Sequence, residues 1–295
     1  MKLEIEGVGK QYRADFWGLS DFTLELEPGV VGLLGENGAG KSTLMRIIAT
    51  VTEPTTGEIR WNGADIRKNP DAIRTKLGYL PQDFGVYPNL NAVEFLEYIG
   101  ALKGVDRKQC KKRIDELLML VNLYDVRKRP LGGYSGGMKQ RIGIAQALIN
   151  DPGILIVDEP TVGLDPTERV RFRNLLSDLS GERIVIFSTH IVSDAEATAS
   201  KIAVVSKGRL LSYSEPDQLL RKVEGKVWEI VVPDSQLQEI RKSNIISGTI
   251  RSSKGVQVRV VSEAAPAVDA KKLEPTLEDA YLYCISTDKG GRGNG

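Results

Sequence analysis

A glycine-rich segment at residues 35–43 has the pattern of a phosphate-binding loop. It reads GENGAGKST and stands between an apolar, strand-like run and a segment with helical spacing. Glycines let backbone N–H groups close around phosphate oxygens, and a helix start adds the positive end of its dipole. The pattern Gly-x-x-x-x-Gly-Lys-Ser in this context predicts nucleotide binding. The residues expected to form the phosphate site are Gly35, Asn37, Gly38, Ala39, Gly40, Lys41, Ser42 and Thr43.

Two acidic residues, Asp158 and Glu159, follow the apolar run ILIV at residues 154–157. In proteins with such a loop, a carboxylate at the C-terminal end of a buried strand lies beside phosphate-bound Mg²⁺. We therefore expect Ser42 and Asp158 to hold Mg²⁺, Lys41 to reach the β- and γ-phosphates, and Glu159 to activate the attacking water. The alternative is a polar strand end that only caps the next loop, and the phosphate-binding loop favours the metal and base roles.

Four further motifs follow the phosphate-binding loop. They are YLPQDF with Gln82, YSGGMKQR with Ser135, GLDP with Asp165, and the only histidine, His190, directly after IVIFST. In this order, and together with the loop and the two carboxylates, they resemble the nucleotide-binding domain of ATP-binding-cassette (ABC) proteins. The resemblance covers about residues 3–220. It implies an ATPase that requires ATP and Mg²⁺.

The resemblance also assigns roles to the remaining motif residues. Two domains pair head to tail as a homodimer or paired cassette, and two ATP molecules lie between them. The turn of Ser135, Gly136 and Gly137 in one domain then faces the γ-phosphate bound by the other, and it precedes a helix whose dipole favours an anion. Gln82 contacts Mg²⁺ or the attacking water, and His190 contacts the γ-phosphate.

Some assignments leave alternatives open. Tyr12 is the expected aromatic partner of adenine, and Phe16 or Trp17 are its alternatives. Asp165 matches the loop that communicates across the dimer, and it also has the position of an N-cap before Pro166. The aromatic set expected either to dock a membrane partner or to pack in the core consists of Phe84, Tyr87, Phe95 and Tyr98.

Two residues depart from the commoner family pattern around the Ser-Gly-Gly turn. Tyr134 stands where leucine is common, and Met138 stands where glutamine is common. Both lie outside the expected phosphate contacts, so the role of the turn is kept.

The elements that must position these residues alternate between strand-like and helix-like segments through about residue 211. Continuous apolar runs at residues 154–157 and 184–188 suit strands buried on both faces of a parallel sheet. The fold class predicted is α/β, a P-loop NTPase core with a mainly parallel sheet. This ATPase domain spans residues 1–222, with a helical insertion at about residues 84–150.

The pattern changes after Glu224. Alternating apolar residues around Trp228 and Val258 predict the strands of a small α+β unit at residues 225–285. Thr276 and Asp279 have the spacing of a capping box, which predicts a terminal helix. Residues 286–295 are expected to be disordered. We expect this unit to stabilise the dimer or to regulate it.

Composition restricts the remaining possibilities. The 40 basic and 39 acidic residues give a formal net charge of +1, which does not suit a strongly basic nucleic-acid binder. The cysteines Cys110 and Cys284 lie far apart in the sequence, as expected of thiols in a reducing cytoplasm. We expect no signal peptide, and no run of roughly 18 apolar residues predicts a membrane span.

The resemblance to ABC proteins implies a cytoplasmic ATPase that a separate permease holds at the cytoplasmic face of the membrane. The motif order, the single cassette and the ending PTLEDAYLY resemble bacterial drug- and antibiotic-export ATPase subunits. Export is expected on that resemblance. The alternative is a soluble ABC ATPase that acts on ribosomes or DNA, and we expect no nucleic-acid partner.

Overall fold

The computed structural model describes residues 1–253 and 255–290. The chain divides into two compact units: Met1–Lys201 with Val205–Leu210, and Ile202–Val204 with the residues from Leu211 onward. This division precedes the boundary at residues 222–225 that the sequence pattern indicates. It does so because helix α8 (Pro216–Arg221) contacts helix α10 (Leu277–Gly290), so its contacts place it with the later unit.

The central sheet has six strands in the order β10-β9-β3-β8-β7-β6. The neighbours β3 and β8, β8 and β7, and β7 and β6 are parallel. Every residue of β7 and β8 is buried, as expected of apolar strands covered on both faces. The predicted P-loop core with a mainly parallel sheet is thereby confirmed. The strands are β3 (Gly29–Leu34), β6 (Leu77–Leu80), β7 (Ile154–Val157), β8 (Ile184–Thr189), β9 (Lys201–Ser206) and β10 (Arg209–Ser214).

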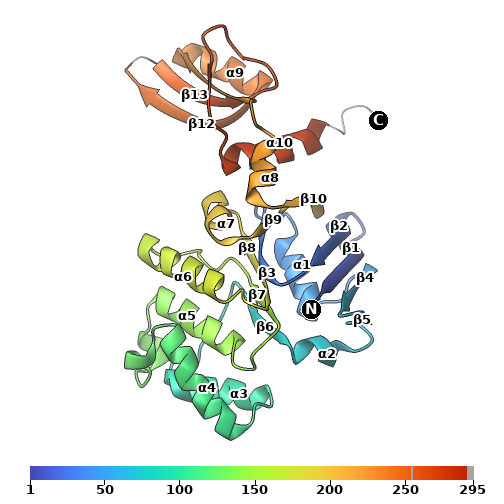
Figure 1. The fold of residues 1–295 in the computed structure, drawn as a ribbon, viewed down its shortest axis with the longest axis vertical. Coiled ribbons are helices and arrows are strands. Elements are labelled where there is room, and N and C mark those ends of the chain that lie inside the picture. Colours follow the sequence, from blue (N-terminus) through green and yellow to red (C-terminus); the bar gives the residue numbers. More distant parts are fainter. Residues whose placement is uncertain (254, 291–295) are drawn as a thin grey trace. The chain divides into compact units, whose positions relative to one another are not determined.

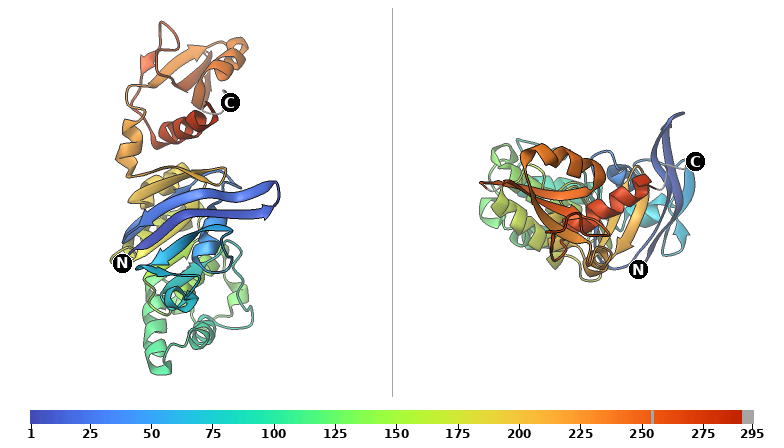
Figure 2. Two further views of the ribbon diagram at one scale, coloured as in Figure 1. Left: turned by 90° about the vertical axis from the view of Figure 1, so that its right-hand side faces the viewer. Right: turned by 90° about the horizontal axis from the view of Figure 1, so that it is seen from above.

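A second, antiparallel sheet in the first unit has the strand order β2-β1-β4-β5. The long strands β1 and β2 run side by side (Figure 2). This sheet was not predicted from the sequence, although Leu3 and Ile5 are buried while Glu6 is exposed, in the alternation typical of a half-covered strand. The strands are β1 (Leu3–Arg13), β2 (Phe16–Leu26), β4 (Thr56–Trp61) and β5 (Ala64–Asp65).

The expected helical insertion is present. Helices α3, α4 and α5 contact one another and cluster at one end of the first unit (Figure 1). Helix α5 also contacts β6, which joins this cluster to the central sheet. The elements are α1 (Lys41–Ile48), α2 (Pro70–Arg74), α3 (Ala92–Leu102), α4 (Arg107–Leu120), η1 (Tyr124–Val126), η2 (Leu131–Gly133), α5 (Gly136–Ala147), α6 (Pro166–Asp178) and α7 (Val192–Thr198).

The second unit contains a four-stranded sheet in the order β12-β13-β11-β14. Alternating side chains of β11 and β13 form its apolar core with Leu237, and Ile240 and Ile246 pack against that core. The strands predicted around Trp228 and Val258 are therefore confirmed. The remaining elements are β11 (Val227–Val232), η3 (Asp234–Gln236), α9 (Leu237–Ser243), β12 (Ile245–Ser252), β13 (Gly255–Val261) and β14 (Lys271–Lys272).

Helix α10 begins with the expected capping box. The Thr276 amide donates to Asp279 Oδ2 over 2.7 Å, and the Asp279 amide donates to Thr276 Oγ1 over 3.5 Å. The helix continues to Gly290, so the prediction of disorder was wrong for residues 286–290. The prediction was wrong because the polar composition of residues 286–290 is also compatible with a further turn of helix α10. Residues 291–295, also predicted to be disordered, lie outside the described residues.

None of the described helices combines the length and the apolar character that crossing a membrane requires.

Candidate functional site

The phosphate-binding loop connects the end of β3 to the start of α1, as the sequence predicts. It forms one side of a pocket of about 270 Å³ that also contains Gln82 and Glu159. Gly40 has a φ of +106°, and a Cβ atom there would lie 2.5 Å from the Gly18 carbonyl oxygen. The loop residues in the pocket are Asn37, Gly38, Ala39, Gly40, Lys41, Ser42 and Thr43.

Gly35 does not line this pocket, although the sequence analysis grouped it with the phosphate contacts. A Cβ atom at Gly35 would collide with the Val205 carbonyl oxygen, so a close approach to neighbouring backbone requires glycine here. The Gly35 carbonyl accepts a hydrogen bond of 2.7 Å from Lys41 Nζ. Gly35 therefore shapes the loop and orients the lysine.

Lys41 and Glu159 form a buried ion pair at the base of the pocket. Lys41 Nζ lies 3.2 Å from Glu159 Oε1, and the two side chains are 5% and 6% exposed. His190 Nδ1 lies 2.8 Å from the other carboxylate oxygen, Glu159 Oε2. The three residues come from α1, the end of β7 and the end of β8, and the fold brings them together as the motif order predicts.

Ser42 and Asp158 also meet. The Ser42 hydroxyl donates to Asp158 Oδ1 over 3.1 Å. With the Gln82 side chain in the adjacent pocket, these groups supply the hydroxyl, carboxylate and amide oxygens that Mg²⁺ prefers. The residues present therefore fit a magnesium ion bound beside the loop.

Ser188 is a site residue that the sequence analysis missed. Its fully buried hydroxyl donates to Asp158 Oδ1 over 2.6 Å and accepts from the Glu159 amide over 2.7 Å. Glu159 has a φ of +47°, a conformation that costs free energy in any residue except glycine. The Ser188 hydrogen bond holds the Glu159 backbone in that conformation. The available signal was a serine directly after the apolar residues 184–187 of the strand and two residues before the histidine.

The Asp158 carboxylate also acts on a neighbouring strand. Tyr79 in β6 has a pKa above its ordinary value, chiefly because it is partly buried and further because Asp158 is negatively charged. Removing a proton from Tyr79 would place a second negative charge near Asp158. The phenol therefore stays neutral beside the Asp158 carboxylate.

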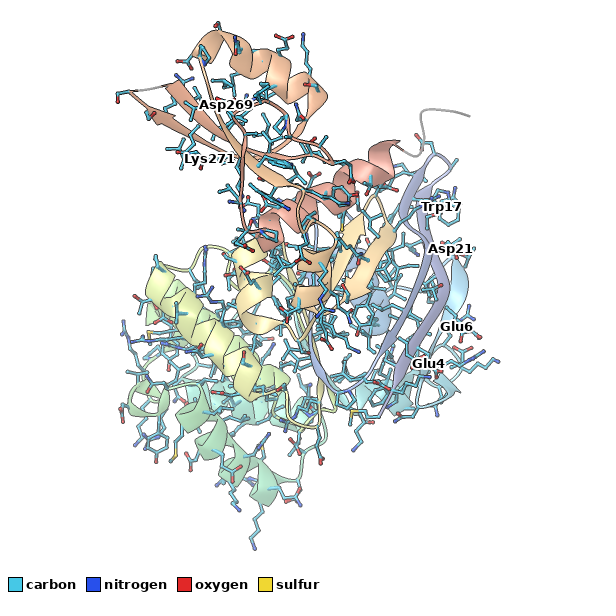
Figure 3. All side chains as sticks on the ribbon, turned by 45° about the horizontal axis from the view of Figure 1, so that its top comes forward. Glu4, Glu6, Trp17, Asp21, Asp269 and Lys271 are labelled. Carbon is cyan, nitrogen blue, oxygen red and sulfur yellow. The ribbon has the colours of Figure 1, made fainter. Side chains whose placement is uncertain are left out.

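Two of the three candidate aromatics line the pocket. Tyr12 and Phe16 stack with ring centroids 6.1 Å apart, and the Tyr12 hydroxyl lies 3.2 Å from Thr43 Oγ1. Trp17 does not line the pocket, because its ring packs over Gly9, where a Cβ atom would lie 2.9 Å away. It lies on the antiparallel sheet that also carries Glu4 and Glu6 (Figure 3).

The Ser-Gly-Gly turn is separate from the pocket of its own chain. Ser135 caps helix α5, and its hydroxyl accepts from the Met138 amide over 3.2 Å. A Cβ atom at Gly136 would meet no atom within 4 Å, so this side of the turn is open. Residues Ser135, Gly136 and Gly137 do not line the pocket that contains Lys41.

The structure also shows the surroundings of Asp165 and of the four aromatic residues for which the sequence left two roles open. Asp165 is the N-cap of α6 and accepts from the Glu168 amide over 2.9 Å. Among the four aromatic residues, Phe95 is buried and Phe84 packs edge-on against it. Tyr87 and Tyr98 are exposed and pack against each other with centroids 5.5 Å apart. Core packing therefore accounts for Phe95, and the two tyrosines form an exposed aromatic pair.

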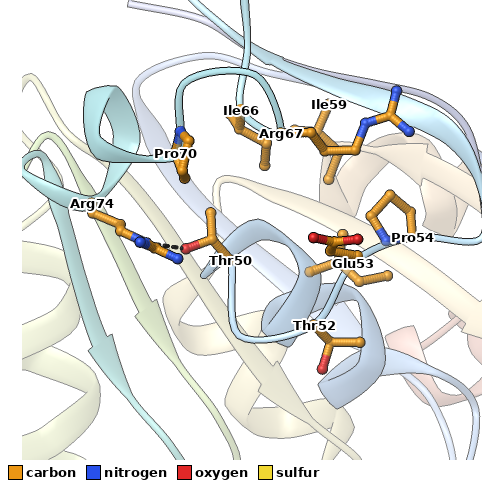
Figure 4. Close-up of a pocket in the computed structure, with 10 residues that line it drawn as sticks. Thr50, Thr52, Glu53, Pro54, Ile59, Ile66, Arg67, Pro70 and Arg74 are labelled. Carbon is orange, nitrogen blue, oxygen red and sulfur yellow. Dashed lines mark hydrogen bonds between the residues drawn. The ribbon is translucent and has the colours of Figure 1, made fainter.

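A second, smaller pocket lies at the opposite end of α1 (Figure 4). Ile47, Ile59 and Ile66 line it, and Arg74 reaches across to donate to Thr50 Oγ1 over 2.8 Å. None of the motif residues lines it, so it is distinct from the phosphate site.

Comparison with known proteins identifies the family. The family model described as "ABC transporter" matches residues 19–162. A daunorubicin resistance ATP-binding protein of Streptomyces coeruleorubidus is 30% identical over 97% of this chain and 96% of its own length. A Nod factor export ATP-binding protein of Cupriavidus metallidurans is 34% identical over 74% of this chain and 72% of its own length.

A solved structure has the same fold. It is a dimeric, post-hydrolysis ATP-binding cassette bound to ADP and phosphate, and it matches with a TM-score of 0.65 and 27% identity over 72% of this chain and 98% of its own. The matched family, the relatives and the geometry around Lys41 and Glu159 agree. The chain therefore belongs to the ATP-binding subunits of ABC transporters and is an ATPase of that family.

Proposed function

We propose that this ATPase works as a pair of copies with composite ATP sites and that it drives export through a separate membrane permease. The observation that carries the catalytic part is the Glu159 carboxylate, held between Lys41 and His190 at 3.2 Å and 2.8 Å beside the phosphate-binding loop. The dimeric cassette among the similar structures supports the pairing. The relative named for Nod factor export and the one named for drug resistance support the direction.

The geometry suggests how the residues divide the work. The loop amides and the Lys41 ammonium bind the β- and γ-phosphates of ATP. Glu159 orients the attacking water and accepts its proton, while His190 stands next to that carboxylate. Lys41 and the amides of the loop stabilise the negative charge that develops on the γ-phosphate oxygens.

Ser42, Asp158 and Gln82 would hold Mg²⁺. A bound Mg²⁺ would supply charge neutralisation at the phosphates. Asp158 is held in place by the hydroxyls of Ser42 and Ser188, which both donate to its Oδ1 atom.

The second half of each site comes from the Ser135–Gly137 turn of the other copy. The turn begins α5, so its free amides and the helix dipole favour an anion. Because the turn does not line the pocket of its own chain, one copy alone offers an incomplete phosphate site. ATP closes the pair, hydrolysis lets it open, and this movement would act on the permease at the cytoplasmic face of the membrane.

The decisive experiment uses Glu159→Gln. The variant should bind ATP as the wild type does, hydrolyse it far more slowly and form an ATP-dependent dimer, measured by size-exclusion chromatography with light scattering. Wild-type turnover by this variant would overturn the role of Glu159. A monomer at saturating ATP and high protein concentration would overturn the composite site.

Co-purification tests the partner. A hydrophobic, multi-span membrane protein recovered with the tagged chain supports the permease. Recovery with ribosomes or DNA would support the competing function, to which the relatives described above give no support.

The second unit is proposed to stabilise the dimer or to regulate it, since it holds none of the motif residues. Unchanged dimerisation and unchanged ATPase activity after deletion of residues 225–285 would contradict this role.

A further inference from the structure

Glu168 packs against the Ser-Gly-Gly turn from within the same chain. A Cβ atom at Gly137 would lie 2.7 Å from Glu168 Oε2 and 2.9 Å from its Cγ atom. A side chain at position 137 would force the Glu168 side chain to move from this place. Gly136, in contrast, has no such neighbour within 4 Å. The two glycines therefore have different surroundings: the turn is open at Gly136 and is covered by Glu168 at Gly137.

The Glu168 carboxylate is held by two guanidinium groups. Arg141 Nη1 lies 2.9 Å from Glu168 Oε2, and these side chains are 11% and 16% exposed. Arg171 Nη1 lies 2.8 Å from Oε1. Gly137 and Arg141 are four residues apart on α5 and so lie on the same face of that helix. Glu168 therefore runs along the first turn of α5 and joins it to the start of α6.

A second hydrogen bond joins the same helix turn to the segment that follows Glu159. Gln140 Nε2 donates to the Pro160 carbonyl oxygen over 3.2 Å. The chain from residue 160 to residue 168 is thus tied to α5 near both of its ends. Asp165 lies between these two points and caps α6 through the Glu168 amide.

A carboxylate beside an anion-binding turn would normally weaken the binding of phosphate. Here two guanidiniums accompany the one carboxylate, so the cluster of Arg141, Glu168 and Arg171 carries a formal charge of +1. Breaking the Arg141–Glu168 pair would leave a partly buried guanidinium without its carboxylate and free the turn to move.

We propose that Glu168 is a positioning residue that holds the Ser135–Gly137 turn in the conformation that receives the γ-phosphate of ATP bound by the other copy. This inference rests on the composite site of the proposed function. Glu168 acts through Gly137 and Arg141 and does not contact the nucleotide bound in its own chain. Its loss therefore weakens closure of the pair and leaves the first nucleotide contact intact.

The test measures two quantities in a Glu159→Gln background. The first is the affinity of the monomer for ATP, measured by calorimetry at low protein concentration. The second is the dimer dissociation constant at saturating ATP and Mg²⁺, measured by analytical ultracentrifugation. Adding Glu168→Gln should weaken the dimer by about tenfold, the size of a moderate coupling between contacting groups. The ATP affinity of the monomer should stay close to that of the background, whereas the melting temperature should fall because Arg141 loses its partly buried carboxylate partner.

Asp178→Asn is the matched control. It removes one acidic charge from the last residue of the same helix, far along α6 from the turn, and should leave the dimer unchanged. Arg141→Lys keeps the charge but loses the forked geometry, and it should weaken the dimer in the same direction as Glu168→Gln. The double variant should be no weaker than the more affected single variant.

The outcomes separate this inference from the function on which it rests. If the Glu159→Gln background does not dimerise in ATP, the composite site itself is wrong. If the background dimerises and both Glu168→Gln and Arg141→Lys dimerise equally well, the positioning role is wrong. Equal losses in monomer ATP affinity and in dimerisation would also overturn it, because they would place the effect in the chain's own phosphate site.

Discussion

The Glu159 amide donates a 2.7 Å hydrogen bond to the buried hydroxyl of Ser188, and this contact fixes the backbone of the proposed catalytic base. The same hydroxyl donates to Asp158 Oδ1. One serine in β8 thus orders both carboxylates at the end of β7. The left-handed conformation of Glu159 turns its side chain to where Lys41 and His190 meet it.

We expect Ser188→Ala to lower kcat about tenfold while KM for ATP changes little, since the loosened residues act on hydrolysis. It should also lower the free energy of unfolding by about 1–3 kcal/mol, because the buried Glu159 amide loses its acceptor. Steady-state ATPase assays and chemical denaturation measure the two effects. Ser180→Ala, which removes a hydroxyl after the end of α6, is the control, and an equal loss of kcat in both variants would contradict the role of Ser188.

Adenine binding should depend on the aromatics that line the pocket. Tyr12→Ala or Phe16→Ala should raise the Kd for ATP by about tenfold, the typical value for losing one base-stacking ring. Trp17→Ala should leave the Kd unchanged, because that ring packs over Gly9. Fluorescence titration with a labelled ATP analogue measures all three. A loss confined to Trp17→Ala would show that the adenine lies elsewhere.

Lys41→Ala should reduce ATP hydrolysis by about 100-fold or more, as expected when a charged group that stabilises the transition state is removed. The structure adds that Glu159 Oε1 and the Gly35 carbonyl would lose their shared partner. ATPase assays at saturating ATP, with Lys68→Ala as an exposed control, test this. Near-normal hydrolysis by Lys41→Ala would exclude the phosphate role of the loop.

The second unit should depend on Asp279, whose carboxylate is fully buried and accepts from Arg259 Nε over 3.0 Å and from Arg259 Nη2 over 2.7 Å. Burial alone would raise the pKa of Asp279, but hydrogen bonds from Arg259 and Thr276 hold it below its ordinary value. Asp279→Asn should lower the free energy of unfolding by about 3 kcal/mol at neutral pH.

The pH dependence has a definite sign. Because the pKa of Asp279 is lower in the folded protein, its contribution is complete above the unfolded pKa and is lost as the pH falls through the folded pKa. The difference in melting temperature between wild type and Asp279→Asn should therefore be constant near neutrality and shrink below about pH 4. Glu278→Gln, exposed in the same helical turn, is the control. A difference that grows on acidification would contradict this assignment.

Motif spacing was sufficient to predict which motif residues the fold brings together around Lys41 and Glu159. Lys41 follows a run of glycines, and His190 is the single histidine and follows a strand. Both residues therefore have distinctive positions in the sequence, at the ends of parallel strands that the fold brings together. Ser188 was missed because a serine in a buried strand has no distinctive spacing, and its role appears only when β7 and β8 are seen to be neighbours.

Two other features could not be predicted from the sequence, because they arise from contacts between segments that are distant in the sequence. The antiparallel sheet of β1, β2, β4 and β5 pairs residues as far apart in the sequence as Leu3 and Trp61, and its register cannot be obtained from alternation alone. Glu168 is one of several acidic residues in a helix. Its position against Gly137 became visible only when the crossing of α5 and α6 was known.

The Arg259–Asp279 pair has a consequence for how the chain folds as it is synthesised. The strand β13 that carries Arg259 leaves the ribosome 20 residues before Asp279. Until Asp279 has been synthesised, the Arg259 guanidinium lacks its carboxylate partner. The buried ion pair of the second unit can therefore form only after α10 has been synthesised. The first unit, which contains every residue proposed for the ATP site, is synthesised earlier and is free to fold first, domain by domain.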